Sequence, residues 1–337
     1  MSHVEEPLLS VRNLCTYFGS DDGVLRAVDD VSFNLRKGET LGVVGESGSG
    51  KSVTSLSLLR LVPDPPGKIV RGEVWFQGED ILSLPLAAVR RIRGKRIGVI
   101  FQDPMTSLNP FLRISAQLME LTRLHLRHTK REAHEHAIGM LETVGIPDAR
   151  RRADDYPHEF SGGMRQRVMI AMALSCRPEL LIADEPTTAL DVTIQAQILE
   201  LIRSLKNQTG LSVILITHDL GVVAGMTDRV VVMYAGKVFE QATTRELFAR
   251  PANPYTKALL RSMPDPEKTP AGALYQIPGL PPDVSRLGAG CPFAPRCERA
   301  EDVCRSEFPP FVQLAPEHFS LCHFAAEIYA RPNILNA

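Results

Sequence analysis

Short runs of aliphatic and β-branched residues alternate along the chain with longer stretches in which apolar residues recur at helical spacing. The short runs predict strands near residues 8–17, 26–35, 39–44, 72–77, 97–102, 180–184, 212–217, 229–233 and 237–241. Because strands that alternate with helices are typical of layered sheets and helices, the pattern favours an α/β fold.

Two regions depart from this alternation. Residues 114–125 and 130–144 have helical periodicity, and the strand pattern is absent between Pro104 and Phe160, which predicts an all-helical insert over about 104–164. From about residue 250, prolines cluster at positions 264, 266, 270, 278, 281 and 282 with little periodicity. We therefore expect a main domain over residues 1–250 and a small irregular, cysteine-containing domain over residues 251–337.

Length, composition and charge are those of an ordinary globular protein. The 337 residues are 44% hydrophobic and 23% charged, and the formal net charge is −1. This balance gives no global field for binding nucleic acid. The first residues lack the basic and apolar parts of a signal peptide, and no apolar run is long enough to span a bilayer. We expect a cytoplasmic protein whose membrane role, if any, depends on partners.

Gly45–Ser52 reads Gly-Glu-Ser-Gly-Ser-Gly-Lys-Ser and matches the pattern G-x-x-x-x-G-K-S/T. A strand pattern precedes it, and an apolar helical pattern runs from Val53 to Leu61. Strand, glycine loop and helix together aim a helix N-terminus at an anion. The loop therefore predicts nucleotide binding, in which Lys51 reaches the terminal phosphates and Ser52 binds Mg²⁺.

Two further segments add chemistry to this loop. The buried strand pattern at Leu180–Ala183 ends in Asp184 and Glu185, a pair suited to hold Mg²⁺ and to polarise the water that attacks the γ-phosphate of ATP. Ser161-Gly162-Gly163 stands before a helical pattern that continues to Cys176. A Ser cap followed by two glycines predicts a second exposed helix N-terminus that can bind phosphate.

Taken in order, these segments resemble the full motif set of ATP-binding-cassette (ABC) ATPases. The residues that carry the resemblance are Gly45–Ser52, Gln102, Ser161-Gly162-Gly163, Asp184-Glu185, Ala189-Leu190-Asp191 and Thr217-His218-Asp219, within Leu8–Gln241. The resemblance implies a P-loop ABC cassette with a mixed sheet and an inserted helical subdomain. It also implies ATP and Mg²⁺ as ligands.

The same resemblance assigns roles to individual residues. Glu185, His218 and Gln102 are expected to be catalytic. His218 would contact the γ-phosphate, and Gln102 would also contact Mg²⁺ and relay to a transmembrane partner. Mg²⁺ ligands would be Ser52, Gln102 and Asp184. Phe18 would stack on adenine, with Tyr17 as the alternative. The complete ATP-binding set is Phe18, Tyr17, Gly45, Ser47, Gly48, Ser49, Gly50, Lys51, Ser52, Val53, Ser161, Gly162, Gly163 and Asp191, of which the last faces the partner cassette.

Three longer segments are similar to one branch of this family. Phe101–Pro110, Ile182–Gln197 and Asn253–Leu260 resemble the oligopeptide, dipeptide and nickel importers. That likeness implies an ATP-hydrolysing motor subunit on the cytoplasmic side of the cell membrane. Its partners would be a paralogous cassette in a heterodimer, two transmembrane permease subunits and an extracytoplasmic binding protein, without nucleic acid. No residue distinguishes a peptide from nickel as the transported solute.

Four of the six cysteines fall in the C-terminal region, at Cys291, Cys297, Cys304 and Cys322. A cytosolic location disfavours disulfides, so the four thiols could hold zinc, an iron–sulfur cluster or no metal. Zinc sites favour closer cysteine pairs than these. The resemblance to the importer branch implies a 4Fe–4S cluster.

Two other functions fit parts of the chain. A soluble cassette ATPase that acts on nucleic acid or ribosomes would share the motifs, but such proteins usually carry a coiled coil or a second cassette, which this chain lacks. A metal-sensing or redox-sensing regulator could use the cysteines, but no signalling output is apparent.

Overall fold

The computed structural model describes residues 6–20, 23–103, 107–188, 190–263 and 275–331. Positions 104–106 and 189, which belong to two of the predicted motifs, lie outside the described residues, as do the prolines at 264, 266 and 270. The chain divides into two compact units. Unit 1 comprises residues 1–35, 40–82 and 217–337, and unit 2 comprises residues 36–39 and 83–216.

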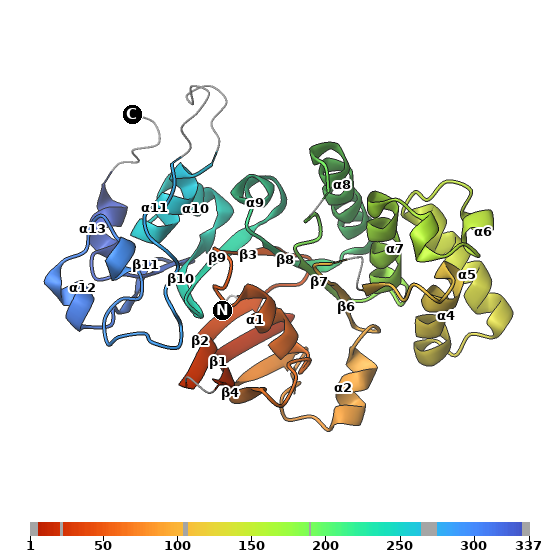
Figure 1. Ribbon diagram of the computed structural model, residues 1–337, viewed down its shortest axis with the longest axis horizontal. Coiled ribbons are helices and arrows are strands. Elements are labelled where there is room, and N and C mark those ends of the chain that lie inside the picture. Colours follow the sequence, from red (N-terminus) through yellow and green to blue (C-terminus); the bar gives the residue numbers. More distant parts are fainter. Residues whose placement is uncertain (1–5, 21–22, 104–106, 189, 264–274, 332–337) are drawn as a thin grey trace, which may run out of the picture. The chain divides into compact units, whose positions relative to one another are not determined.

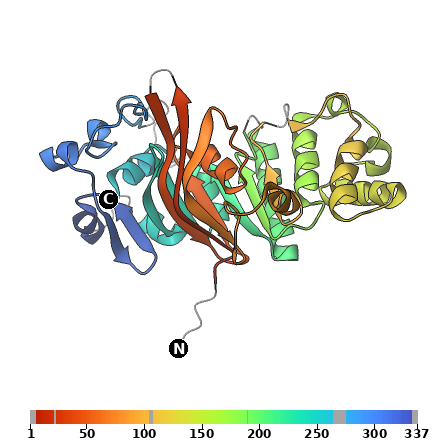
Figure 2. The same cartoon turned by 90° about the horizontal axis from the view of Figure 1, so that it is seen from below.

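Unit 1 begins with an antiparallel sheet of order β2-β1-β4-β5. Its strands are β1 (Leu9–Ser20), β2 (Gly23–Leu35), β4 (Gly67–Phe76) and β5 (Glu79–Asp80). Figure 2 shows the long strands β1 and β2 in red, with β4 in orange beside them. Leu9, Leu14, Val28 and Val31 are fully buried, so one face of this sheet is a core face.

The second sheet region of unit 1 is mixed, as the sequence predicts. β3 (Thr40–Val44) pairs in parallel with β9 (Arg229–Tyr234), and β9 pairs antiparallel with β10 (Lys237–Thr243). All residues of β3 and β9 are buried, which explains their unbroken apolar runs. The helices here are α1 (Lys51–Leu58), α9 (Leu220–Met226), α10 (Thr244–Ala249) and α11 (Pro254–Arg261) (Figure 1).

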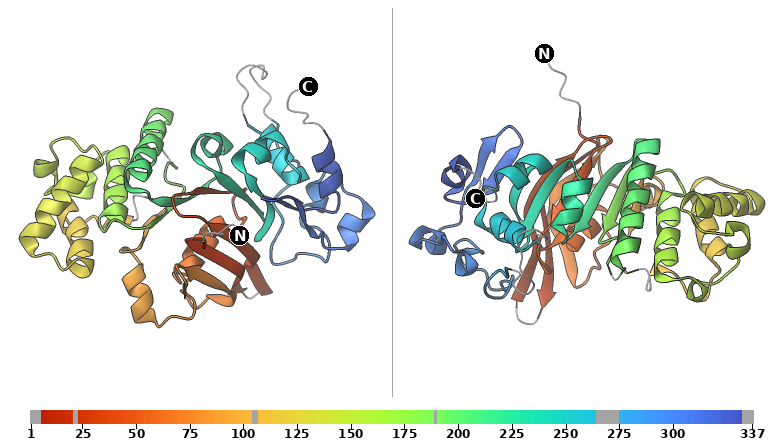
Figure 3. Two further views of the ribbon diagram at one scale, coloured as in Figure 1. Left: turned by 180° about the vertical axis from the view of Figure 1, so that it is seen from behind. Right: turned by 90° about the horizontal axis from the view of Figure 1, so that it is seen from above.

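Unit 2 contains three parallel strands and a group of helices. β6 (Ile97–Ile100), β7 (Leu180–Asp184) and β8 (Ser212–Thr217) pair in the order β6-β7-β8, although Thr217 itself falls in unit 1. The helices are α2 (Leu86–Ile92), α4 (Ile114–His125), α5 (Lys130–Thr143), α6 (Ala149–Arg152), α7 (Gly162–Leu174) and α8 (Val192–Thr209). Figure 3 shows α4, α5 and α7 grouped together, in yellow to green.

The C-terminal region is more regular than its sequence predicts. β11 (Phe311–Ala315) and β12 (His318–Leu321) form a hairpin, and β12 pairs with β10. Two short helices, α12 (Asp302–Ser306) and α13 (Ala325–Ala330), flank the hairpin in sequence. The sequence predicts an irregular domain here, since elements this short produce no clear periodic pattern. In the structure, pairing with the preformed strand β10 stabilises the hairpin.

One apolar core joins this region to the rest of unit 1. Buried Val44 and Val232 belong to the same cluster as Tyr255 of α11, Phe293 and Leu321 of β12. The C-terminal region therefore packs on the sheet that carries β3, and it shares that core.

A buried polar network fixes the same junction. Glu240 of β10 and His318 of β12 are at most 1% exposed, and their Oε1 and Nε2 atoms lie 2.7 Å apart. Glu240 also accepts hydrogen bonds from the backbone N–H groups of Ala252 and Asn253. Since each oxygen of this buried carboxylate has a donor, its desolvation is compensated.

Asn253 sits at the centre of this junction. Its side-chain amide donates to the carbonyls of Phe239 and Leu321 at 3.1 and 3.0 Å, and its oxygen accepts from the Tyr255 N–H at 3.0 Å, which caps α11.

None of the helices among the described residues is long and apolar enough to cross a bilayer.

We predict that Asn253→Ala lowers the free energy of unfolding by about 3 kcal/mol, because it leaves buried carbonyls and a helix N–H without partners. Urea denaturation measures the effect. Asn207→Ala, at an exposed position of α8, is the control and should change stability by less than about 0.5 kcal/mol. Equal stability of the two variants would contradict the role of Asn253.

Candidate functional site

The loop between β3 and α1 has a backbone that only glycine allows at two of its positions. Gly45 and Gly50 have φ angles of 154° and 100°. A Cβ on Gly45 would lie 2.1 Å from the Met233 carbonyl oxygen, and one on Gly50 would lie 2.2 Å from that of Ala27. The loop thus wraps tightly over buried backbone before α1 begins at Lys51.

The polar side chains of the loop fit an anion site. Lys51 is 5% exposed, and its Nζ donates to the carbonyls of Gly45 and Glu46 at 2.7 and 2.9 Å. The ammonium therefore lies across the loop. The hydroxyl of Ser49 is buried with no hydrogen-bond partner among the described atoms. A helix N-terminus, a lysine and a glycine cradle are the groups that bind nucleotide phosphates.

Unit 2 brings two of the predicted catalytic residues together. Glu185 Oε2 accepts hydrogen bonds from Gln102 Nε2 at 3.0 Å and from Thr188 Oγ1 at 2.8 Å. The backbone of Glu185 has φ 47° and donates its N–H to the Ile216 carbonyl. Asp184 directly before it is 6% exposed at the end of β7. Left-handed backbone at a non-glycine residue costs energy, and such strain is concentrated at functional sites.

The Ser-Gly-Gly segment forms the helix N-terminus that the sequence predicts. Ser161 is the N-cap of α7, and its hydroxyl accepts the Met164 N–H at 3.3 Å. A Cβ on Gly163 would lie 2.8 Å from Ile194 of α8, so this glycine permits close packing of the two helices. Asp191 caps α8 through the Ile194 N–H at 2.9 Å.

The two aromatic candidates for adenine stacking are adjacent on β1 but have different surroundings. The Tyr17 hydroxyl donates to Asp29 at 2.8 Å, and the Arg26 guanidinium lies over its ring. Burial and the Asp29 carboxylate raise the pKa of Tyr17. Phe18 has no polar atom to hold it, and its ring lies beside Gly67. Fewer fixed contacts leave Phe18 the better candidate.

The predicted site residues fall into both units. Unit 1 contains the phosphate loop, Tyr17, Phe18 and the exposed His218. Unit 2 contains Gln102, the Asp184–Glu185 pair, the Ser161 helix N-terminus and Asp191.

The four C-terminal cysteines line one small cavity, so the fold brings them together. Three of their sulfurs accept backbone N–H groups two residues further along: Cys291 from Phe293, Cys297 from Arg299, and Cys322 from Phe324, the last at 3.4 Å. Hydrogen bonds of this kind stabilise sulfur atoms that carry negative charge.

Burial acts in the opposite direction on these thiols. It raises the pKa of Cys291 to about 12 and that of Cys322 to about 11, and it also raises the pKa of Cys297, while the N–H groups lower each value. Without a bound cation these three thiols stay protonated at neutral pH. In the part of the chain that is described, no group of three or more His, Cys, Asp or Glu residues could hold a metal ion.

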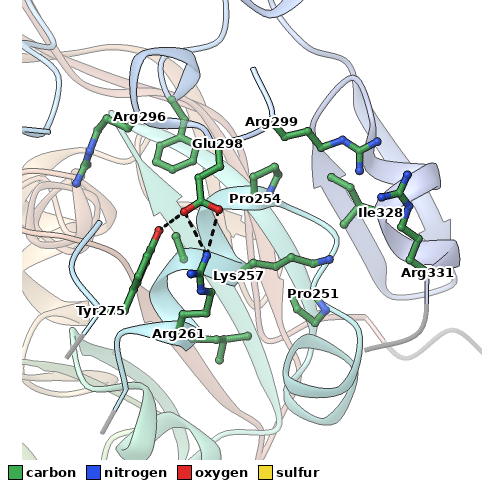
Figure 4. A pocket seen from close by; sticks show the side chains of 13 residues that line it. Pro251, Pro254, Lys257, Arg261, Tyr275, Arg296, Glu298, Arg299, Ile328 and Arg331 are labelled. Atoms are coloured by element: carbon green, nitrogen blue, oxygen red, sulfur yellow. Dashed lines mark hydrogen bonds and ion pairs between the residues drawn. The ribbon is translucent and has the colours of Figure 1, made fainter. Parts of the chain in front are cut away.

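A larger cavity of about 460 Å³ lies nearby in unit 1 (Figure 4). Its cationic wall is already largely neutralised. Arg261 pairs with Glu298, while Arg299 and Arg331 both pair with Glu327. Figure 4 shows the Arg296 side chain directed away from the other labelled charges.

Sequence reasoning missed the partner of Arg296. Its guanidinium makes two bonds to Glu46, a position that the phosphate-loop pattern leaves unspecified. The two residues are 250 positions apart, and no local pattern links them.

Comparisons with known proteins agree with the motif order. Residues 28–188 match the family described as "ABC transporter", and residues 239–304 match "Oligopeptide/dipeptide transporter, C-terminal region". The chain is 53% identical to the "Probable peptide ABC transporter ATP-binding protein y4tR" of Sinorhizobium fredii, over 95% of this chain and 96% of that protein. It is 50% identical to the "Oligopeptide transport ATP-binding protein OppD" of Escherichia coli, over 94% and 93%.

Solved structures give the same fold. A dimeric ATP-binding cassette in a post-hydrolysis state, bound to ADP and Pi, has a TM-score of 0.63 and 28% identity, over 70% of this chain and 99% of that one. The cbiO1 cassette of Clostridium perfringens, part of the ABC transporter complex cbiONQ, has a TM-score of 0.60 and 27% identity, over 72% and 91%.

We predict that Gly45→Ala abolishes binding of a nucleoside triphosphate, because its Cβ overlaps the Met233 carbonyl and the loop must move. Gly78→Ala, outside the phosphate loop, is the matched control. It has a φ of 81° but nothing within 4 Å of the new Cβ, so backbone strain of about 1 kcal/mol is its main cost. Calorimetric titration of both variants distinguishes them, and equal affinities would contradict the cradle geometry.

Proposed function

The chain belongs to the ABC transporter ATP-binding proteins, and we propose that it is the ATP-hydrolysing subunit of an importer for dipeptides or oligopeptides. It is 53% and 50% identical to two such proteins, over 95% and 94% of its length. As a member of this family it is an ATPase. The observation that carries the peptide substrate is the pairing of the cassette with the oligopeptide/dipeptide transporter C-terminal region in one chain.

The alternatives account for less of the chain. A soluble cassette ATPase that acts on nucleic acid or ribosomes gives no role to the C-terminal region. An importer of nickel or another solute would use the same machinery, so only a transport measurement separates it from a peptide importer.

The proposed site residues have distinct roles in hydrolysis. The α1 N-terminus and Lys51 hold the phosphates of ATP, and Ser52, Gln102 and Asp184 are the proposed ligands of Mg²⁺. When bound there, Mg²⁺ would supply positive charge that neutralises the phosphate oxygens. The Glu185 carboxylate polarises the attacking water, and Gln102 and Thr188 hold that carboxylate in place. His218 contacts the γ-phosphate, and Phe18 stacks on adenine.

The Ser161 helix N-terminus and Asp191 are proposed to act on a partner. One solved cassette with this fold is dimeric. We infer a head-to-tail dimer with a paralogous cassette, in which the Ser161 helix faces the nucleotide of the neighbour. Two transmembrane permease subunits would dock on the helices of unit 2, and an extracytoplasmic binding protein would deliver the peptide. The chain would then be a peripheral protein on the cytoplasmic side of the membrane.

We also propose that Cys291, Cys297, Cys304 and Cys322 hold a 4Fe–4S cluster. The proposal is supported by the four thiols that line one cavity and by the backbone N–H groups at three of them. Zinc fits less well, because zinc sites favour cysteine pairs two to four residues apart, and these four cysteines are spaced more widely. The cluster would cross-link a region of short elements.

The proposed function predicts that the chain co-purifies with permease subunits and that the reconstituted complex hydrolyses ATP faster when peptide and binding protein are added. Glu185→Gln should retain ATP affinity and lose hydrolysis by about 100-fold or more, because the amide keeps the shape and loses the charge that polarises water. A phosphate-release assay measures the rate. Glu200→Gln, at an exposed position of α8, is the control.

Stimulation by nickel and not by peptide would show that nickel is the transported solute, and the assignment of the chain as an ATPase would stand. A Glu185→Gln complex with wild-type turnover would assign water activation to another group.

The cluster predicts that protein purified without oxygen is brown and contains about four irons per chain. Replacing any one of the four cysteines by serine should remove the colour, while Cys176→Ser, at a buried cysteine outside the cavity, should keep it. Iron analysis and visible absorption measure both. Colourless protein with one bound zinc, or with no metal and a folded C-terminal region, would contradict the cluster.

A further inference from the structure

An ion pair connects the phosphate loop to the C-terminal region. The Arg296 guanidinium donates from Nη1 and Nη2 to the two oxygens of Glu46, at 2.6 and 2.9 Å. The Arg296 side chain is 5% exposed and that of Glu46 is 24% exposed. Hydrogen bonding to this carboxylate raises the pKa of Arg296. A two-point contact of this type fixes the orientation of the carboxylate and also pairs its charge.

Arg296 is itself held on the opposite side. It ends a single 3₁₀ turn, Ala294–Arg296. Its Nε donates to the Pro278 carbonyl at 2.9 Å, and its Nη1 donates to the Tyr234 hydroxyl at 3.2 Å. The side chain therefore links β9, the segment around Pro278 and the phosphate loop, all of which belong to unit 1.

Glu46 is held at three points. Its N–H donates to the Tyr255 hydroxyl at 2.9 Å, its carbonyl accepts from Lys51 Nζ, and its carboxylate accepts from Arg296. Two of these three partners come from residues beyond position 250. In addition, Pro281–Val284 and Glu46–Ser49 line the same cavity of about 240 Å³. The C-terminal region thus forms part of the surroundings of the phosphate loop.

The charge of Glu46 makes this pair important for the reaction. A carboxylate in the phosphate loop repels a polyanionic nucleotide, and the repulsion is strong where water is partly excluded. Arg296 neutralises the carboxylate and holds it in one direction. Without Arg296, Glu46 becomes a partly buried unpaired charge next to the site of the phosphates.

We propose that Arg296 is a positioning residue for ATP binding, which acts through Glu46 to hold the phosphate loop and to cancel its negative charge, so that the C-terminal region contributes to the nucleotide site. Arg296 need not touch ATP for this role. The proposal rests on the assignment of the chain as an ATPase. It does not depend on which solute is transported or on which metal the four cysteines hold.

The test is a double-mutant cycle on the full chain, with the Kd for ATP and for ADP measured by calorimetry. Arg296→Gln should raise the Kd for ATP roughly tenfold or more, and the Kd for ADP less, because the repulsion grows with phosphate charge. In a Glu46→Gln background, Arg296→Gln should have little further effect, because the carboxylate that it exposes is gone. A purely structural role would weaken both nucleotides equally.

Arg261→Gln is the matched control, because it breaks the Arg261–Glu298 pair in the same region without a contact to the phosphate loop. It should leave the Kd for ATP unchanged. If Arg296→Gln does not fold, Arg296→Lys takes its place, since it keeps the charge and loses the two-point contact, and it should raise the Kd for ATP severalfold. Wild-type ATP affinity in the folded Arg296 variant, or equal losses in both Glu46 backgrounds, would overturn the proposal.

Discussion

The packing of four aromatic rings beneath the phosphate loop is the interaction on which unit 1 depends. Tyr234 of β9 lies 4.5 Å from Tyr255 of α11 and 5.4 Å from Phe293, measured between ring centroids, and Phe239 of β10 completes the group. Tilted and edge-on contacts at these distances stabilise beyond their buried area. Because Tyr255 and Tyr234 then bind Glu46 and Arg296, the same cluster that forms the core also orients the nucleotide loop.

This arrangement changes how the C-terminal region is understood. It shares a core, a sheet and a buried carboxylate network with the β3–β9–β10 strands, so it is not an independent appendage of the cassette. A change in this region can reach the loop through the short rigid contacts of Tyr255 and Arg296. In unit 2 a comparable rigidity surrounds Glu185, whose strained backbone and two side-chain donors fix one carboxylate direction.

The chemistry-bearing segments were predictable because each is local in sequence. Gly45–Ser52 and Ser161-Gly162-Gly163 specify their own helix N-termini through glycine geometry and a serine cap, and the structure forms both. Motif order predicted Gln102 and Glu185 separately as site residues, and the structure adds the hydrogen bond between them at 3.0 Å. The roles of these residues toward ATP stay predictions, as does the metal at the four cysteines.

By itself, the sequence determined the α/β class, the phosphate loop, the acidic strand end and the ABC family, since short-range patterns of glycine, charge and apolar residues encode them. Only the tertiary structure decided that β12 extends the sheet and that Arg296 meets Glu46. These contacts join residues far apart in the chain, and their energies depend on burial and neighbours that no local pattern records.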